Sequence, residues 1–458
     1  MTTKPQQTEA KFSTFPSSLT EFVSFDGGVH HQQLLVRPDR YRNLEAIPPN
    51  QPRVVRGGGY SYAAASFGGE SVVIENCAFN RILEMDAENG VLECEAGTRL
   101  EKIYFAAAPA GWILPVQPGY PKITIGGCIT TDAHGKNQFR DGTFRRHVIS
   151  MRLFHPSYGI LELSRDSNRE VFELTCGGLG LTGQILSVRL QLQKVSGINV
   201  HFFSQRLRNL EDVPRMMEGV ANETELLYTW HNLSLLGKNF GRGFLYGAKF
   251  VPHVVMESIN PKFRIRPIDS QTRSRLWFQF LNGFTTQSFN LMYELLQLLS
   301  AKQRTLKLSD FLFPVSTKVL FFELFGRKGF HEYQMIIPRE AFSDAIGKIR
   351  QYIKRDHVAI CLASCKLFRG EQTLLRFDGD GVCLALDFPR DAKSYRFASS
   401  LDELVQDLKG LPNIIKDSRL PPTVVQACYS DYDLFRSCLL KFDPKRVYRS
   451  EISERLGL

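Results

Sequence analysis

The sequence of 458 residues lacks the usual marks of a membrane-spanning, secreted or metal-binding protein. No apolar run approaches the ~20 residues of a membrane span, and the polar N-terminus lacks the apolar stretch of a secretion signal. The nine cysteines are odd in number and none forms a C-x-x-C pair, which disfavours a disulfide framework or a cysteine zinc site. We therefore expect a cytoplasmic protein without a metal site.

The net charge excludes few classes of protein, but it favours certain kinds of partner. The chain has 57 lysines and arginines against 47 aspartates and glutamates, a formal net charge of +10. This balance favours phosphorylated or acidic partners, or an anionic membrane surface. No Lys/Arg-dense tail or recognition module is present, so we expect no nucleic-acid partner.

Glycine is concentrated in one part of the chain. Of 35 glycines, 18 fall between Gly57 and Gly183, where they form clusters that alternate with short strand-like runs. This pattern predicts an α+β domain whose backbone wraps a large ligand. The clusters are at 56–65, 118–120, 125–127, 134–137 and 177–183, the strands at 71–75, 91–95, 148–154, 159–163 and 184–195, and a helix at 99–110 has Thr98 as its N-cap.

Beyond Gly197 the elements become longer. Their order predicts a sheet with helices on one face, and two amphipathic helices at 431–440 and 446–456 follow. The strands are expected at 199–207, 225–231, 243–250, 333–338, 357–362 and 382–388, and the helices at 278–299, 339–353 and 401–409.

The glycine clusters have a chemical interpretation. Three successive glycines at 57–59 can expose several N–H groups on one side, a nest suited to a pyrophosphate, although a tight turn between strands is an equal alternative. Neither a Walker loop nor G-x-G-x-x-G is present, which disfavours a nicotinamide Rossmann site. Gly126 and Gly127, followed by His134 and Gly135, form a segment that can run flat against a planar ring.

Together these motifs resemble the FAD-binding oxidases of the vanillyl-alcohol oxidase (PCMH-type) superfamily, and within it the decaprenylphosphoryl-β-D-ribose 2′-oxidase family. The resemblance continues at 311–316, 329–338, 365–370, 384–389 and 415–419, outside the glycine clusters. It implies an α+β, two-domain flavoprotein. We expect an FAD-binding domain at 1–196, an antiparallel-sheet substrate domain at 197–409, and a C-terminal segment at 410–458 that returns to the FAD domain.

The resemblance also assigns residues. Tyr60 stands where relatives with covalent flavin carry a histidine, so FAD is expected to bind non-covalently. The implied catalytic residues are Lys416, His134 and Gln334, and the implied substrate-binding residues are Lys366, Asp387, Asn413, Ala385 and Tyr62. The implied FAD contacts are Arg56, Gly57, Gly58, Gly59, Tyr60, Ser61, Tyr62, Gly119, Tyr120, Thr124, Gly126, Gly127, Thr131, Asp132, His134, Gly135, Asn137, Gly183 and Ile185.

The implied reaction is oxidation of a sugar secondary hydroxyl to a ketone, with the flavin accepting the hydride. Lys416 would either have a lowered pKa and take the proton, or hold the alcohol oxygen by a hydrogen bond. The alternative is that Lys416 pairs with Asp417 or another acid on a solvated turn. The leading substrate is the 2′-hydroxyl of polyprenylphosphoryl-β-D-ribose, in the first half of an epimerisation that an NAD(P)H-dependent short-chain reductase completes. A quinone-like acceptor would reoxidise the flavin.

Departures from the family pattern keep two alternatives open. Asn413 stands where the family has a tyrosine, and Ala385 where it has a cysteine. These changes motivate a sugar, aldonolactone or nucleoside-sugar oxidase of the same superfamily as one alternative. A non-catalytic FAD-binding module is the alternative from another class.

One region suggests a lipid. Residues 262–280 carry five basic residues against one acid, and a stripe of apolar residues continues to Leu299. This combination suits a phosphate head with an apolar tail, or peripheral contact with the inner face of a membrane. The alternative is a solvated basic loop followed by a core-facing helix.

Overall fold

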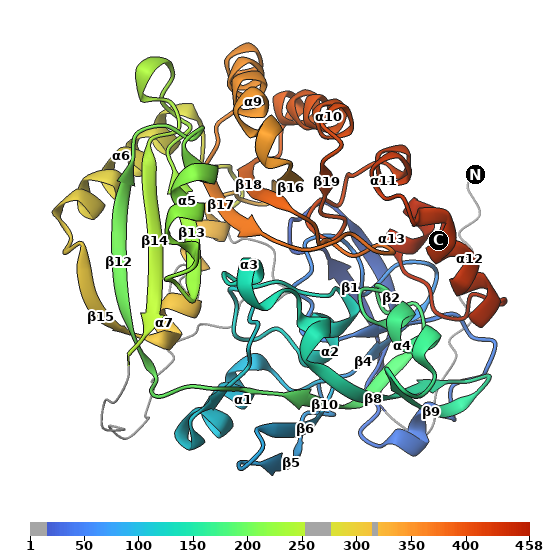
Figure 1. Cartoon of the computed structure of the whole chain (residues 1–458). Helices are drawn as coiled ribbons and strands as arrows, with labels where there is room; N and C mark the ends of the chain where they lie inside the picture. Colours follow the sequence, from blue (N-terminus) through green and yellow to red (C-terminus); the bar gives the residue numbers. More distant parts are fainter. Residues whose placement is uncertain (1–15, 252–275, 314–318) are drawn as a thin grey trace, which may run out of the picture.

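The computed structural model describes residues 16–251, 276–313 and 319–458. The glycine-rich part of the chain forms two sheets and a short ribbon, and the later part forms one eight-stranded sheet. Figure 1 shows the glycine-rich part, coloured blue to green, packed beneath the eight-stranded sheet. The predicted α+β architecture, with a large antiparallel sheet in the second part, is confirmed.

The first part contains most of the predicted short strands. In the four-stranded sheet, β4 runs parallel to both of its neighbours, whereas the five-stranded sheet is antiparallel. The predicted strand at 184–195 is divided into β10 and β11. The first sheet has the order β1 (Ser17–Val23), β2 (His30–Val36), β4 (Val72–Glu75), β3 (Arg53–Arg56); the second has β5 (Ile82–Asp86), β6 (Val91–Glu95), β10 (Gln184–Gln191), β8 (Val148–His155), β9 (Gly159–Ser164); β7 (Trp112–Ile113) pairs with β11 (Gln193–Lys194).

Two local predictions in this part were wrong. Helix α1 (Leu100–Ala107) has Arg99 at its N-cap, because the Thr98 hydroxyl donates instead to the carbonyl of Arg81. The segment expected to run flat at 125–127 is the start of helix α2 (Ile125–Thr130), which Thr124 caps. Helices α3 (Gln138–Asp141) and α4 (Arg169–Thr175) complete this part.

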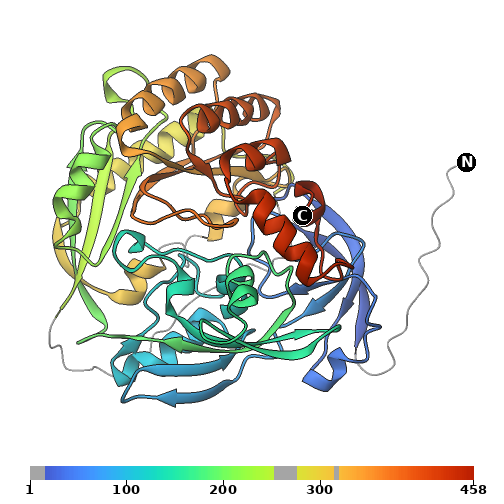
Figure 2. The same cartoon turned by 45° about the vertical axis from the view of Figure 1, so that its right-hand side comes forward.

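The second part is built on the eight-stranded antiparallel sheet. Figures 1 and 2 show helices α9 and α10 on one face of this sheet and the glycine-rich part on the other. Within the described residues, no helix is long and apolar enough to cross a membrane. The strand order is β15 (Gln303–Lys307), β12 (Asn199–Leu207), β14 (Gly243–Phe250), β13 (Leu226–His231), β17 (Leu362–Phe368), β18 (Gly381–Pro389), β16 (Phe330–Ile337), β19 (Leu411–Pro412).

Several boundaries differ from the sequence predictions. The strand predicted at 357–362 is wrong, because His357 adopts a left-handed conformation that ends α9 (Phe342–Asp356) and the strand begins only at Leu362. The helix predicted at 401–409 is the second half of α10. The remaining helices are α5 (Val213–Ala221), α6 (Gly283–Leu299), α7 (Leu308–Leu312), α8 (Val319–Glu323) and α10 (Ala392–Asp407).

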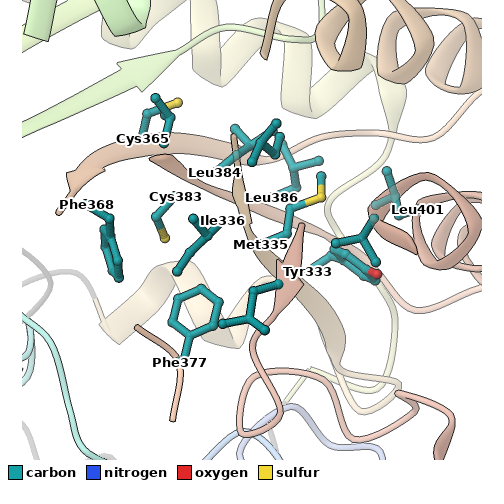
Figure 3. Packing of buried hydrophobic residues seen from close by; sticks show 14 of the residues in the cluster. Tyr333, Met335, Ile336, Cys365, Phe368, Phe377, Cys383, Leu384, Leu386 and Leu401 are labelled. Carbon is teal, nitrogen blue, oxygen red and sulfur yellow. The ribbon is translucent and has the colours of Figure 1, made fainter. Parts of the chain in front are cut away.

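Alternation along the central strands separates core from cavity. On β18, Leu384 and Leu386 join the core that α9 and α10 cover, whereas Ala385 and Asp387 line a cavity on the other face. This is the period of two that a strand imposes on its side chains. Figure 3 shows Leu384 and Leu386 on the helix side, near Leu401 of α10. The same sheet therefore presents an apolar face to its helices and a polar face to the glycine-rich part.

The C-terminal segment links the two parts. After β19, which pairs with β16, come α11 (Pro422–Cys428), α12 (Tyr432–Phe442) and α13 (Glu451–Leu456). The helix predicted at 446–456 begins only at Glu451. Tyr448 forms a bridge with Arg53 beside β4 and donates to the carbonyl of Phe154 on β8. The predicted domain boundaries at 196 and 409 stay predictions.

The capping box of α10 provides a test of this part of the fold. The Asp391 carboxylate accepts a hydrogen bond of 2.8 Å from the Ser394 N–H, and the Asp391 N–H donates at 2.8 Å to the Ser394 hydroxyl. We expect Asp391→Ala to lower the free energy of unfolding by about 1 kcal/mol, measured by urea denaturation. Asp407→Ala, at the exposed other end of the helix, should leave it nearly unchanged; equal losses would contradict the capping role.

Candidate active site

A cavity of about 370 Å³ lies between the glycine-rich loops and the polar face of the eight-stranded sheet. The glycine-rich part contributes three loops that are distant in sequence. The sheet contributes side chains from β16, β17 and β18, and the C-terminal segment adds Asn413 and Lys416. The predicted cofactor residues that line the cavity are Gly57, Gly58, Gly59, Tyr60, Ser61, Tyr62, Gly119, Tyr120, Thr124, Gly126, Gly127, Thr131, His134, Gly183 and Ile185.

The glycine side of this cavity fits FAD. A Cβ placed on Gly119 or Gly180 would meet no atom within 4 Å, so the backbone there faces open space. Gly59 and Gly180 have φ of 72° and 77°, a conformation that side chains disfavour. The buried Ser61 hydroxyl has no hydrogen-bond partner in the described structure. Open backbone together with an unpaired hydroxyl suits the close approach of a pyrophosphate and a planar ring.

Four predicted cofactor residues are not in the cavity wall: Arg56, Asp132, Gly135 and Asn137. The Arg56 guanidinium lies 5.0 Å from the centre of the Phe22 ring. The buried Asp132 carboxylate accepts hydrogen bonds of 2.9 Å from the 143–145 segment, and the Asn137 amide donates at 2.7 Å to a backbone carbonyl. The structure therefore places these residues behind the loops, where they support the cavity wall.

The sheet side carries the predicted catalytic and substrate-binding residues. Gln334 on β16, Lys366 on β17, and Ala385 and Asp387 on β18 all line the cavity. Because β16 and β18 are antiparallel, Glu332 lies directly opposite Asp387. Two carboxyl groups on adjacent strands therefore share the cavity floor.

Lys416 is held at the centre of the site. Its Nζ lies 3.0 Å from Oε1 of Glu332 and 3.7 Å from the centre of the Tyr62 ring. Of the alternative, a pair with Asp417 or another acid on a solvated turn, the Asp417 pair is not formed, because Asp417 pairs with Arg419 at 2.7 Å. Lys416 does pair with another acid, Glu332, but in the cavity wall and not on a solvated turn. The ammonium group is thus oriented by one carboxylate and one aromatic face.

His134 and Lys366 form a second polar pair. Lys366 Nζ lies 3.2 Å from Nε2 of His134. Burial lowers the pKa of His134 well below its usual range, and the neighbouring Lys366 and Lys416 lower it further. Burial also lowers the pKa of Lys366. The pair therefore favours a neutral imidazole, whose Nε2 can accept a hydrogen bond from the Lys366 side chain.

The carboxyl pair has the opposite electrostatics. Burial raises the pKa of Asp387 well above its usual range, and the facing Glu332 raises it further, although Lys416 acts against this shift. Its Oδ1 is buried and has no hydrogen-bond partner in the described structure. Burial, with Glu332 and Asp387 nearby, likewise raises the pKa of the Tyr62 phenol. Burial and the facing Glu332 therefore favour the protonated form of the Asp387 carboxyl.

Gln334 and Asn413 orient each other. Asn413 Nδ2 donates to Oε1 of Gln334 at 2.5 Å, and the Asn413 N–H donates to the Gln334 carbonyl at 2.8 Å. Ala385 lies opposite Gln334 in the strand register.

In the described ranges, no group of three His, Cys, Asp or Glu side chains is arranged to hold a metal ion.

Several residues of the cavity wall were not predicted from the sequence, among them Glu332, Gly180, Phe25 and Phe322. Glu332 could have been found, because the strand period places it on the face of Gln334, two residues further on. Gly180 also belonged to a recognised cluster. Phe25 and Phe322, which line the apolar end of the cavity, carry no local signal because only tertiary packing brings them together.

Comparisons with known proteins agree with this geometry. Residues 46–164 match a family of FAD binding domains. The decaprenylphosphoryl-β-D-ribose oxidase of Mycolicibacterium smegmatis is 27% identical over 88% of this chain and 89% of that protein. The L-galactono-1,4-lactone dehydrogenase of Brassica oleracea is 26% identical over 48% of this chain and 37% of its own length. The L-gulonolactone oxidase of Mus musculus is 28% identical over 33% of this chain and 34% of its own length.

The raised pKa of Asp387 gives a test by pH. In the unfolded chain the carboxyl titrates near its ordinary value of about 4, so above that pH the folded protein holds a proton that the unfolded chain has released. The contribution of Asp387 to the free energy of unfolding must therefore fall as the pH rises through the raised pKa. We expect Asp387→Asn to lose less stability than the unmodified protein between about pH 5 and pH 8, measured by urea denaturation. Asp407→Asn, which removes an exposed carboxylate, should follow the unmodified protein; parallel curves for all three would contradict the assignment.

Proposed function

Because this chain is an FAD-binding oxidoreductase, with an FAD binding domain over residues 46–164, we propose that it oxidises a secondary hydroxyl of a phosphorylated sugar to a ketone. The observation that carries the proposal is the Lys416–Glu332 pair, which faces the glycine-rich loops across one cavity. The leading substrate is the 2′-hydroxyl of polyprenylphosphoryl-β-D-ribose. Similarity over 88% of the chain to a protein named for decaprenylphosphoryl-ribose supports this choice.

The glycine side would hold the cofactor. FAD, when bound, supplies a hydride acceptor that no side chain can replace. Gly119 and Gly180 offer the open backbone, and Ser61 the unpaired hydroxyl, that its pyrophosphate and ring require. Tyr60 occupies the place of a linking histidine, which supports non-covalent binding.

The sheet side would manage the proton and the substrate. Lys416 holds the alcohol oxygen through its ammonium group, and the proton that leaves this oxygen is taken up by the Lys416–Glu332 pair. The unpaired Oδ1 of Asp387 is free to bond a second sugar hydroxyl. Lys366 offers a cation for a phosphate, and Phe25 and Phe322 offer an apolar surface for whatever the phosphate carries.

An oxidase of soluble sugars or aldonolactones is the second candidate. Two relatives that match part of the chain favour it, because one is named a galactonolactone dehydrogenase and the other a gulonolactone oxidase. Asn413 and Ala385 also depart from the pattern of the ribose oxidases. A nucleoside-sugar substrate and a non-catalytic FAD-binding module stay as alternatives. The NAD(P)H-dependent reductase partner, the quinone-like acceptor and a peripheral position at the inner face of a membrane stay predictions.

The mode of FAD attachment has a direct test. We expect the yellow purified protein to release all of its flavin into the supernatant on acid or heat denaturation, because no histidine follows the glycines of the 57–59 loop. Absorbance and fluorescence of the two fractions measure the release. Flavin that remains with the precipitated chain would contradict non-covalent binding.

The substrate and the role of Lys416 are tested together. Under anaerobic conditions we expect polyprenylphosphoryl ribose to bleach the bound flavin faster than free aldonolactones or sugars do, as followed by stopped-flow absorbance. Lys416→Ala and Glu332→Gln should slow this reduction about 10²- to 10⁴-fold and retain FAD.

The matched control for these variants is Lys441→Ala, which removes a lysine that is 83% exposed. It should reduce the flavin at the unmodified rate. Preferential bleaching by lactones would select the second candidate. If no substrate bleaches the flavin, and Lys416→Ala changes nothing, the non-catalytic alternative holds.

A further inference from the structure

Helix α6 has inverted polarity. Its buried residues are Thr286, Asn290 and Glu294, which repeat every four positions and therefore share one face. A helix that packs on a globular protein normally buries its apolar face and exposes its polar one. In α6 the polar stripe faces the protein.

Each residue of the buried stripe contacts another part of the protein. Glu294 forms an ion pair of 2.6 Å with Arg242, the Asn290 amide donates to the carbonyl of Ile360, and the Thr286 hydroxyl lies 3.4 Å from the sulfur of Cys361. Buried polar groups with such partners specify one orientation. These contacts fix the rotation of the helix about its axis, and they therefore determine which of its residues face outward.

The outward face is apolar. The large exposed side chains include Phe284 and Leu299, which are 79% and 77% exposed, and Leu291, Met292, Leu295 and Leu298. The apolar stripe that continues to Leu299 was compared above with a core-facing helix, but most of it lies on this outward side. Within that stripe Tyr293 alone is partly buried, where it packs against Trp230. Trp277, ahead of the helix, is also 79% exposed. A contiguous apolar face of this kind marks an interaction surface.

The exposed charges along the chain from Trp277 to Lys307 are all positive. Between Trp277 and Lys307 the single acid is Glu294, which is buried in its ion pair. The bases are Lys302, Arg304 and Lys307, all exposed, directly after the helix and along the edge strand β15. An apolar helix face with cations beside it complements an anionic bilayer. A second copy of the same face would instead bring its cations close to these.

The base of α6 adjoins the active-site cavity. Leu281, just ahead of the helix, packs in one apolar cluster with Phe325 and Phe330. That cluster also contacts Phe25 and Phe322 of the cavity wall. The apolar end of the cavity and the exposed helix are thus joined by continuous packing.

We propose that the exposed face of α6, with the cations of β15, docks the protein on an anionic lipid bilayer. The apolar side chains enter the boundary between headgroups and acyl chains, and Lys302, Arg304 and Lys307 bind the anionic headgroups. The docking uses no residue of the flavin cavity, so it holds or fails independently of the proposed oxidation.

The test is binding of the flavin-loaded protein to vesicles of phosphatidylglycerol and phosphatidylcholine, by flotation. We expect Leu295→Ser/Leu299→Ser to weaken binding at least tenfold. Lys302→Gln/Lys307→Gln should weaken binding to the mixed vesicles and reduce its dependence on salt, because Arg304 is then the one cation of the three that remains. Flavin content and the thermal midpoint should be unchanged in both, because the altered side chains are exposed.

The matched control is Leu83→Ser/Leu434→Ser, which removes leucines that are 45% and 52% exposed on other elements; it should bind vesicles like the unmodified protein. Light scattering gives the oligomeric state of each variant. The proposal is overturned if the unmodified protein ignores the vesicles, or if the control loses binding equally. It is also overturned if the α6 variant converts a dimer to a monomer without a change in vesicle binding.

Discussion

The site depends on burying two carboxyl groups opposite each other on adjacent strands with one lysine beside them. Glu332 and Asp387 face each other across β16 and β18, and Lys416 supplies the charge that makes this tolerable. Buried charges are stable only when paired or protonated, and here Glu332 is paired with Lys416 whereas the surroundings of Asp387 favour its protonated form. The arrangement stores a proton acceptor and a hydrogen-bond donor in the same few ångströms.

Local signals predicted the cofactor side better than the substrate side. The glycine clusters report their own backbone needs, so the loops at 57–62 and 119–127 could be assigned to one cavity from sequence. Glu332 was missed because the strand was predicted to begin only at residue 333, whereas β16 begins at Phe330. The strand predicted at 357–362 failed for a related reason: its apolar residues suit a strand, but the left-handed turn at His357 delays the strand to Leu362.

The orientation of α6 shows another limit of sequence patterns. Periodicity revealed an apolar stripe along this helix but could not say whether that stripe faces the sheet. Arg242, Ile360 and Cys361 decide the matter, because they offer the buried polar partners that turn Thr286, Asn290 and Glu294 inward. A polar stripe at four-residue spacing inside an otherwise apolar helix is the part of the pattern that anticipated this.

The lysine at the centre of the site is supplied by the C-terminal segment, whose strand β19 pairs with β16 at one edge of the eight-stranded sheet. During synthesis on the ribosome, the glycine-rich loops emerge and can fold long before Lys416 leaves the exit tunnel. A nascent chain could therefore acquire its cofactor pocket while its proton-handling machinery is still missing. Competence for chemistry would therefore arrive as the last event of biogenesis.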